Sequence, residues 1–355
     1  MRSLALLPLL FVATSALAAR IELIAGGGTQ TAPCPARELQ LKEPFGVEFT
    51  PNDEMIIVEM ASGQRVFRID KTGTAHLLAG TGQKGNNGDG GDPKAAEFAG
   101  LHNLAITPTG TIYLADSFNQ RVRFITPDFS RIEAFAGTGK KGFAGDGGPA
   151  VASVIGTPMQ VALDPHFESL LIADLPNRRI RRVDLKTGVI ATVAGNGLKG
   201  VPSDGQPALE QPLVDPRAVV ADKEGGLYIL ERDGHALRYI DPKGLIKTVV
   251  GTGKKGLSGD GGPALQASMN GPKHLCLDLD GTVLIADAEN HVIRRFDPKT
   301  GLITRVAGTG KAGTAGLGGD PLQCELTRPH GVTIGPDGNL YITDSYNNRI
   351  LRIVP

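Results

Sequence analysis

The amino-acid sequence predicts an all-β protein, a six-bladed β-propeller made of four-stranded antiparallel blades. Three observations support this prediction: a glycine-rich segment that recurs at a fixed spacing, four short apolar runs between successive copies, and a turn acid that occurs six times. A fixed period longer than one supersecondary unit indicates a repeat architecture. Because one closed ring of repeats can hold the whole length, the 355 residues need not divide into two domains.

The glycine-rich segment occurs five times, and its clearest copy, AGTGKKGFAGDGGPA, begins at Ala136. The first glycines of the copies lie 56 to 58 residues apart, at Gly80, Gly137, Gly195, Gly251 and Gly308. GTGKKG matches the dinucleotide-binding fingerprint, but the FAGDGGPA that follows cannot open a helix. We therefore interpret the segments as compact surface loops. Their acids are expected to cap their own turns, with calcium binding as the alternative: Asp89, Asp146, Asp204 and Asp260.

Each repeat contains four short runs rich in Val, Ile, Leu and Tyr, bounded by Gly, Pro, Asp and Asn. In the second repeat these runs are 103–107, 112–115, 121–126 and 132–135. Such runs predict one four-stranded antiparallel sheet, and several sheets packed radially form a propeller. One acid follows the second strand of each repeat, and its six occurrences predict six blades: Glu59, Asp116, Asp174, Glu231, Asp287 and Asp344.

The two ends of the chain are predicted to meet. The last repeat stops at Pro355, after its third strand at 350–354, and lacks a fourth strand. Residues 21–26, IELIAG, look like the fourth-strand segment ITRVAG at 303–308. Residues 21–25 should therefore complete the last blade, so that the ring closes and no sheet edge is left free.

Residues 1–19 predict a secretory signal peptide, with Arg2, an apolar core at 4–12 and the small-residue cleavage site Ala16-Leu17-Ala18. The apolar run is too short to span a bilayer. We expect residues 20–355 to form a single propeller, secreted or periplasmic, monomeric and not inserted in a membrane. Lys plus Arg equals Asp plus Glu, at 37 each, so no global field attracts nucleic acid.

The repeats resemble the NHL repeat. The resemblance lies in YLADSFNQRVR from Tyr113, LIADLPNRRIR from Leu171, LIADAENHVIR from Leu284 and YITDSYNNRILR from Tyr341. The first and fourth blades depart from this pattern, with glutamates at 59 and 231. The resemblance covers essentially the whole mature chain and implies the six-bladed fold. Function is implied less specifically, because the wider class holds binding modules, extracytoplasmic sensors, and a few metal-using lyases and lactone hydrolases.

The acids and arginines that recur in this pattern are interpreted as structural. Asp and Asn at a turn bond their own backbone. We expect Arg121, Arg179 and Arg349 to pair with the recurring acids between neighbouring blades.

Positions that vary between repeats are the candidates for a ligand site. The residue just before the first strand of each blade differs from blade to blade: Phe45, His102, Met159, Arg217, Lys273 and His330. One residue further along stand Gly46, Asn103, Gln160, Ala218, His274 and Gly331. Because the first strand of each propeller blade lines the central channel, these residues should surround one channel mouth. The predicted ligand-binding residues are Phe45, His102, Asn103, Met159, Gln160, Arg217, Lys273, His274 and His330.

Two functions compete at this mouth, and no catalytic residue is predicted. In the first, a binding or interaction module recognises a small anionic ligand or a partner protein through Arg217, Lys273 and the histidines. In the second, His102, His274 and His330 hold a divalent metal in a lyase or lactone hydrolase. The first is favoured over an enzyme, because the offset of His274 by one residue turns its side chain to another face. In a third interpretation, these polar residues are simply exposed to water at the channel mouth and have no function.

The chain has three cysteines. Cys276 lies in an apolar strand and is expected to be a buried free thiol. Cys34 and Cys324 are predicted to form a disulfide that joins the loops leading into the first and last blades, because export permits disulfides and the ring is held shut only where its ends meet.

Overall fold

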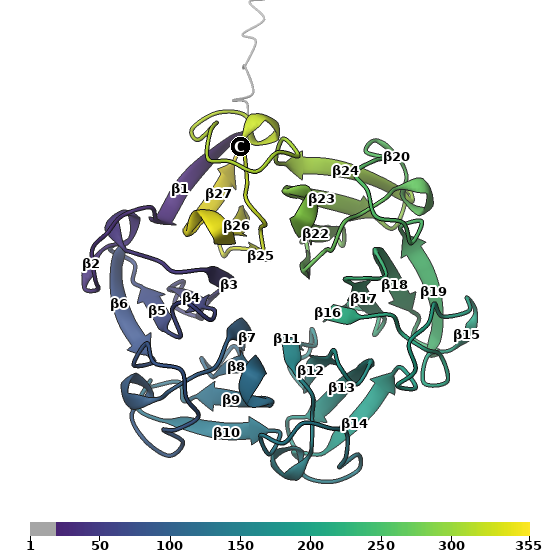
Figure 1. Cartoon of the computed structure of the whole chain (residues 1–355), viewed down its shortest axis with the longest axis horizontal. Coiled ribbons are helices and arrows are strands. Elements are labelled where there is room, and N and C mark those ends of the chain that lie inside the picture. The colour runs from purple at the N-terminus through teal and green to yellow at the C-terminus, as the bar shows by residue number, and fades with distance from the viewer. Residues whose placement is uncertain (1–18) are drawn as a thin grey trace, which may run out of the picture.

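The computed structural model describes residues 19–355, which form six antiparallel sheets arranged around a central axis (Figure 1). The predicted six-bladed all-β fold is confirmed. The predicted signal peptide, residues 1–19, lies outside the described residues except for Ala19. Within the described part of the chain, no helix is long and apolar enough to cross a membrane.

Every blade has the same order of strands from the axis outwards. The inner strands of blades one to six are β3 (Pro44–Phe49), β7 (Leu101–Ile106), β11 (Pro158–Leu163), β16 (Pro216–Ala221), β21 (His274–Leu277) and β25 (Gly331–Ile334). The second strands are β4 (Met55–Glu59), β8 (Ile112–Asp116), β12 (Ser169–Asp174), β17 (Leu227–Glu231), β22 (Val283–Asp287) and β26 (Leu340–Asp344). The third strands are β5 (Val66–Ile69), β9 (Arg121–Ile125), β13 (Arg179–Asp184), β18 (Ala236–Ile240), β23 (Val292–Asp297) and β27 (Arg349–Val354). The outer strands are β6 (Thr74–Ala79), β10 (Ile132–Ala136), β14 (Ile190–Ala194), β19 (Leu245–Val250), β24 (Leu302–Ala307) and, for the sixth blade, β1 (Arg20–Gly26).

Short elements lie in the connections. Two-residue strands extend the outer edge of three blades: β2 (Cys34–Pro35), β15 (Gln206–Pro207) and β20 (Gly262–Pro263). Single 3-10 turns occur in the loops that lead into blades: η1 (Ala36–Glu38), η2 (Pro93–Ala95), η4 (Ala150–Ala152), η5 (Ala264–Gln266) and η7 (Pro321–Gln323). Three more follow second strands: η3 (Ser117–Asn119), η6 (Ala288–Asn290) and η8 (Ser345–Asn347).

The N-terminal strand closes the ring as predicted. β1 pairs antiparallel with β27, and Ile21 lies opposite Ile353. The Ile21 side chain is fully buried. The glycine loop leading into the sixth blade adds a further bond, from Gly318 N to Ile21 O at 2.8 Å. The first and last strands of the described chain therefore share one sheet, beside each other in Figure 1.

The glycine loops fold back over the outer strand of the blade that they enter. Gly90 N donates to Ile132 O, and Gly147 N donates to Ile190 O, each at 2.8 Å. Both glycines have φ above +80°, a conformation that side-chain-bearing residues rarely adopt. The loops therefore occupy hydrogen-bonding groups on the outer edge of each sheet, where an uncovered strand would invite pairing with another chain.

The prediction that the loop aspartates cap their own turns is wrong. Asp89, Asp146 and Asp260 accept hydrogen bonds from arginines on the third strand of their blades, and Asp204 accepts from Thr248 N. The arginines are Arg123, Arg181 and Arg294, all fully buried. A buried guanidinium needs a carboxylate partner, and the loop reaches over the blade to supply one.

The recurring arginines also pair differently from the prediction. Arg349 Nε donates to Asp344 Oδ2 at 2.7 Å within one blade, not between neighbouring blades. Arg121 donates to the loop residue Asp89, and Arg179 donates to backbone carbonyls. The recurring acids instead accept from the loop leading into their own blade, as Asp116 does from Ala99 N at 2.9 Å. These bonds are structural, as expected.

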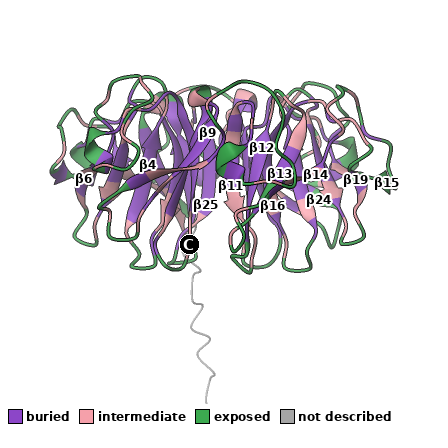
Figure 2. Ribbon diagram, turned by 90° about the horizontal axis from the view of Figure 1, so that it is seen from below, coloured by how far each residue is buried: buried purple, intermediate pink, exposed green. Residues whose placement is uncertain are grey.

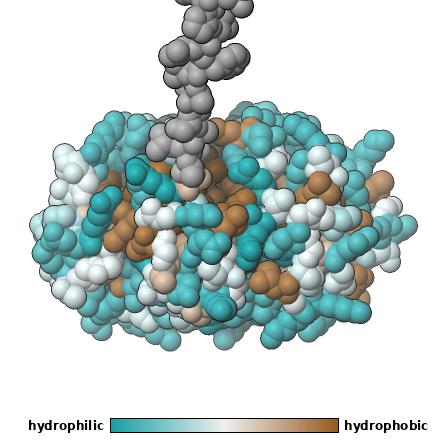
Figure 3. Space-filling view, turned by 90° about the horizontal axis from the view of Figure 1, so that it is seen from above, coloured by the Kyte–Doolittle hydropathy of each residue, from teal (hydrophilic) through white to brown (hydrophobic). Residues whose placement is uncertain are grey.

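The apolar core is divided into six clusters, and each cluster lies between two neighbouring blades. The cluster between blades one and six joins Ile57 and Phe67 to Tyr341 and Ile350. In Figure 2 the buried residues form the strands, and the exposed residues form the loops at both ends of the ring. The surface in Figure 3 is mostly hydrophilic, with small apolar patches between polar residues. The blades are thus held together mainly by face-to-face packing.

The predicted disulfide between Cys34 and Cys324 is not formed, because all three cysteines are free. Cys34 packs in the cluster between blades one and six, whereas Cys324 packs in the cluster between blades five and six. The sixth blade therefore separates the two thiols. The prediction placed both loops at one seam, but each loop packs at the junction between its own blade and the preceding one.

Candidate functional site

The structure brings the six variable residues together at one end of the central channel. We call Phe45, His102, Met159, Arg217, Lys273 and His330 the mouth ring. Each lies in the first two positions of an inner strand or directly before it (Figure 1). Phe45 stacks on His330 with 3.9 Å between ring centroids and meets His102 edge-on at 5.4 Å. On the other side of the ring, Arg217 Nη1 donates to Met159 O at 3.1 Å.

The mouth ring is buried except for Met159, which is partly exposed. His102, Arg217, Lys273 and His330 are 5 to 9% exposed. Two half-exposed aromatic rings overlie the histidines: Phe118 meets His102 edge-on, and Tyr346 stacks on His330. Burial on this scale contradicts the reading in which these residues merely solvate an open mouth.

The two mouth histidines are held in the same tautomer. His102 Nδ1 lies 3.1 Å from Gly100 O, and His330 Nδ1 lies 2.8 Å from Arg328 O. Because a carbonyl only accepts, Nδ1 carries the proton and Nε2 is left as an acceptor. Burial, followed by the positive charge of Arg217, lowers the pKa of His102 to about 3 and that of His330 well below its ordinary value. Both rings are therefore neutral at physiological pH.

Arg217 is a buried cation without a carboxylate. Its bond to Met159 O joins it to a backbone carbonyl, and none of the ion pairs found in residues 19–355 involves it. Burial, together with the charge of Arg232, lowers the pKa of Arg217 to about 9. Lys273 does have a partner, Glu289 Oε1 at 3.2 Å. Asp215 is close enough for its charge to act on the pKa of Arg217, but its ion pair is with Arg232, at 2.7 Å. A buried guanidinium without an ion-pair partner of its own costs several kcal/mol, so Arg217 is short of negative charge.

A second ring lies one residue further into the channel, formed by Gly46, Asn103, Gln160, Ala218, His274 and Gly331. His274 Nε2 lies 3.0 Å from Asn103 Nδ2 and 3.2 Å from Gln160 Nε2. The oxygens of both amides accept from the inner strand of the next blade, at Val161 N and Val219 N. Burial lowers the pKa of His274 to about 3. The predicted site residues Asn103 and Gln160 therefore both bond His274, and these bonds cross the channel.

The three histidines proposed as metal ligands do not form one site. Among the described residues, no group of three His, Cys, Asp or Glu side chains is placed to hold a metal ion. His274 belongs to the second ring, while His102 and His330 flank Phe45 in the mouth ring. His274 is therefore separate from the other two histidines, as the sequence argument expected, but its side chain still points into the channel.

Sequence reasoning missed several charged residues of the channel. Glu289 and Arg328 lie at the mouth as an ion pair, and Glu48 lies deeper, on β3. Glu48 carries a readable signal, because it is the one acid inside an otherwise apolar strand, between Val47 and Phe49. Glu289 and Arg328 follow no repeat pattern, so only the folded ring brings them together.

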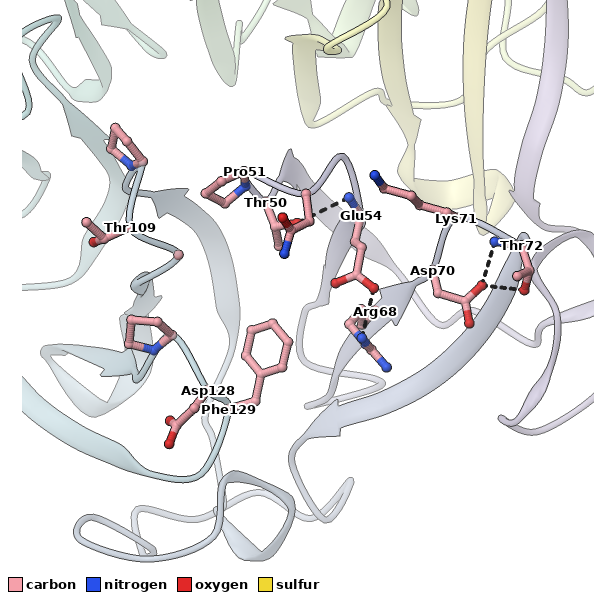
Figure 4. Close-up of a pocket in the computed structure, with 14 residues that line it drawn as sticks. Thr50, Pro51, Glu54, Arg68, Asp70, Lys71, Thr72, Thr109, Asp128 and Phe129 are labelled. Atoms are coloured by element: carbon pink, nitrogen blue, oxygen red, sulfur yellow. Dashed lines mark hydrogen bonds and ion pairs between the residues drawn. The ribbon is translucent and has the colours of Figure 1, made fainter.

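A larger groove on the surface of the described residues lies away from the mouth ring. It has a volume of about 750 Å³ and runs between the loops of blades one and two at the opposite end from the mouth ring (Figure 4). Its charged groups already have partners: Arg68 bonds Glu54 at 2.8 Å, and Asp70 bonds Thr72 and His76. With its charges satisfied, this groove makes a weaker candidate than the mouth ring.

Comparisons with known proteins agree with the fold. The NHL repeat model matches residues 326–353, and the teneurin NHL domain model matches residues 162–258. The chain is 25% identical over 252 residues to Protein SUPPRESSOR OF QUENCHING 1, chloroplastic, from Arabidopsis thaliana, covering 68% of this chain and 24% of that protein. It is 26% identical over 339 residues to NHL repeat-containing protein 2 from Gallus gallus, covering 86% and 46%. The chain thus spans less than half the length of these relatives.

Two solved structures illustrate the range of proteins with this fold. An auxiliary nutrient binding protein from Bacteroides thetaiotaomicron superimposes with a TM-score of 0.66 at 15% identity, covering 95% of this chain and 76% of that chain. A virginiamycin B lyase from Staphylococcus aureus superimposes with a TM-score of 0.54 at 14% identity, covering 95% and 99%. At such identities the likeness establishes the fold alone, and the fold hosts both binding proteins and enzymes.

Proposed function

We propose that this chain, a six-bladed propeller whose repeats match NHL-repeat models, is an exported binding module that takes a small anionic ligand at the mouth ring. The observation that carries the proposal is Arg217, a buried cation with no carboxylate partner in the described chain. An anionic group on a ligand would supply the missing charge through charge-assisted hydrogen bonds. Lys273, close enough for its charge to lower the pKa of His330, would strengthen the attraction.

The histidines narrow the chemistry of the ligand. Nε2 of His102 and of His330 is a free acceptor, since Nδ1 of each ring is the donor. A ligand that presents hydroxyl groups beside its anionic group would use both features. We therefore propose a small hydroxylated carboxylate as the ligand class.

Metal-dependent catalysis is the second candidate function. The favouring observation is the histidine tautomer, because metal-binding histidines commonly donate their other ring N–H to a carbonyl group. Against it stand Arg217 and Lys273, whose positive charges lower the pKa of both histidines and would likewise repel a cation. The charge around the ring therefore favours an anion.

The proposal is tested by calorimetric titration with gluconate, which has both a carboxylate and hydroxyl groups. Hexanoate, which lacks the hydroxyls, and sorbitol, which lacks the charge, serve as comparison ligands. We expect gluconate to bind most tightly. The double variant Arg217→Met/Lys273→Met should weaken gluconate binding by about tenfold or more, because one hydrogen bond to a charged group contributes about 1.5–3 kcal/mol.

A matched control removes two lysines from exposed turns at the far end of the ring. Lys243→Met/Lys299→Met changes the net charge by the same amount and should leave gluconate binding unchanged. Equal weakening in both double variants would mean that only net charge matters and would contradict the proposal. Binding of an acidic peptide but of none of the small ligands would replace the ligand with a protein partner.

Metal analysis distinguishes the metal-dependent enzyme from the binding module. A stoichiometric divalent metal in the purified protein that is lost in His102→Ala would favour the enzyme over the binding module.

Export is tested by N-terminal sequencing of protein made with residues 1–19 in place. We expect a mature chain that begins near Arg20 outside the cytoplasm, whereas an intact Met1 on cytoplasmic protein would contradict export.

A further inference from the structure

The central channel contains a second chamber, on the far side of the second ring from the mouth. This lower chamber has a volume of about 170 Å³. Its lining includes His274, Asn103 and Gln160, the three bonded side chains of the second ring. It extends to Phe167, in the turn after β11 at the opposite end of the ring. The hydrogen-bonded network therefore stands between the lower chamber and the mouth ring.

The chamber is hollow because small side chains occupy one half of its wall. Three residues beyond the mouth ring, the inner strands of blades two, three and four carry Ala105, Ala162 and Val220, which all line the chamber. The corresponding residues of blades one and five are Glu48 and Cys276, which also line it. The chamber thus has an aliphatic side and a polar side.

Glu48 is the only acid that lines the chamber. Thr333 Oγ1 donates to Glu48 Oε1 at 3.2 Å, and no ion pair of residues 19–355 includes Glu48. Burial raises the pKa of Glu48 to about 7, since no cation offsets the loss of hydration. Cys276 supplies no charge, because burial holds its thiol pKa well above the ordinary value. A carboxyl group in an aliphatic cavity without a cation leaves the site short of positive charge.

We propose that the lower chamber binds a small aliphatic ammonium ion, with its charged head on Glu48 and its tail against Ala105, Ala162 and Val220. The ammonium group would supply the cation that Glu48 lacks, through a charge-assisted hydrogen bond. The tail would cover aliphatic wall that otherwise faces water. With about 30 Å³ per water-sized group, the chamber accommodates roughly six non-hydrogen atoms. An n-butylammonium ion, with four carbons and one nitrogen, fits this limit.

This site is independent of the mouth ring and has the opposite charge preference. The mouth ring has the unpaired cation Arg217, whereas the lower chamber has the unpaired acid Glu48. The two sites open toward opposite ends of the channel, since Phe167 lies at the far end from Arg217. An experiment that disproves ligand binding at one site therefore does not disprove binding at the other.

The test is a calorimetric titration of the full mature chain with n-butylammonium, alongside n-butanol and butyrate. We expect saturable one-site binding of n-butylammonium and weaker or no binding of the other two. Glu48→Gln should weaken n-butylammonium binding by about tenfold or more, because it removes the charge and keeps the shape. Glu54→Gln, which alters an acid directly before β4 that is already paired with Arg68, is the matched control and should bind as the wild type does.

A second measurement fixes the location. Nuclear Overhauser effects from the ligand methyl group should reach the Ala105 and Ala162 methyl groups, and Ala162→Leu, which fills the chamber, should abolish binding. The proposal is overturned if n-butylammonium shows no saturable binding, if Glu48→Gln binds it as tightly as the wild type does, or if the ligand contacts other residues. Folding of each variant is checked by its circular dichroism spectrum, so that loss of binding in a folded Glu48→Gln variant is decisive.

Discussion

Replacing Glu48 by Gln should change how the stability of the protein depends on pH. Burial raises the pKa of Glu48 from 4.5 to about 7. The folded protein therefore holds the Glu48 proton more tightly than the unfolded chain does. Its contribution to stability is fully present below pH 4.5 and is lost as the pH rises toward 7. Gln has no proton to lose, so the variant escapes this loss.

The size of the effect follows from the shift. A difference of about 2.5 pKa units, at about 1.36 kcal/mol per unit, corresponds to roughly 3 kcal/mol. Relative to the wild type, Glu48→Gln should therefore be up to about 3 kcal/mol more stable at pH 8 than at pH 4. Gln also keeps an oxygen that can accept from Thr333 Oγ1, so little packing is lost.

The assay is urea unfolding of both proteins at several pH values, compared as a difference so that other titrating groups cancel. Glu54→Gln provides the control, because it makes the same chemical change at a carboxylate that is paired with Arg68 and lies outside the lower chamber. A difference between Glu48→Gln and the wild type that stays flat from pH 4 to 8 would refute the reasoning.

Three further predictions concern the ring. Ile21→Asp should lower the unfolding midpoint strongly in a thermal melt, by the several kcal/mol expected for an unpaired charge in the core, and an unchanged midpoint would argue against closure by β1. His235 Nδ1 accepts from Gly271 N of the next blade, and burial lowers its pKa, so the protein should lose stability below pH 6.5. His235→Gln should lessen that loss, because Gln64 accepts from Gly100 N in the same way without titrating; an equal loss in both proteins would contradict this. Thiol titration of protein unfolded without reductant should return three free thiols, whereas a count of one would show that two of the cysteines form a disulfide.

The repeat pattern allowed the fold to be predicted from the sequence, but it did not predict the contacts between side chains of different blades. Residues 21–25 were assigned to the last blade because they look like a fourth strand, and β1 confirms this. The disulfide failed because the period gives the order of blades but not which junction a loop packs into, as Cys34 and Cys324 illustrate. Repetition identifies positions, whereas contacts between side chains depend on the three-dimensional ring.

The position of the candidate site could be predicted from the sequence, but its hydrogen bonds and unpaired charges could not. The mouth ring converges because inner strands of a propeller must begin around one axis. Local geometry then departs from simple alternation, since pairing register shifts at the start of β3, β7, β11 and β16. No sequence pattern reports that shift. For the same reason, the network of Asn103, Gln160 and His274, and the lack of a partner for Arg217, emerged only from the structure.

The sharing of one sheet by β1 and β27 has a consequence for how the protein is made. Arg20 pairs with Val354, so β1 is synthesised more than 300 residues before its partner strand. Until β27 has been synthesised, β1 has no neighbour in its own blade, while blades one to five can assemble from segments already made. The final closure joins residues more than 300 positions apart, and such distant contacts form late because the chain must first lose much of its freedom. Before β27 is available the blades can form only an open crescent, and the pairing of β1 with β27 closes the ring.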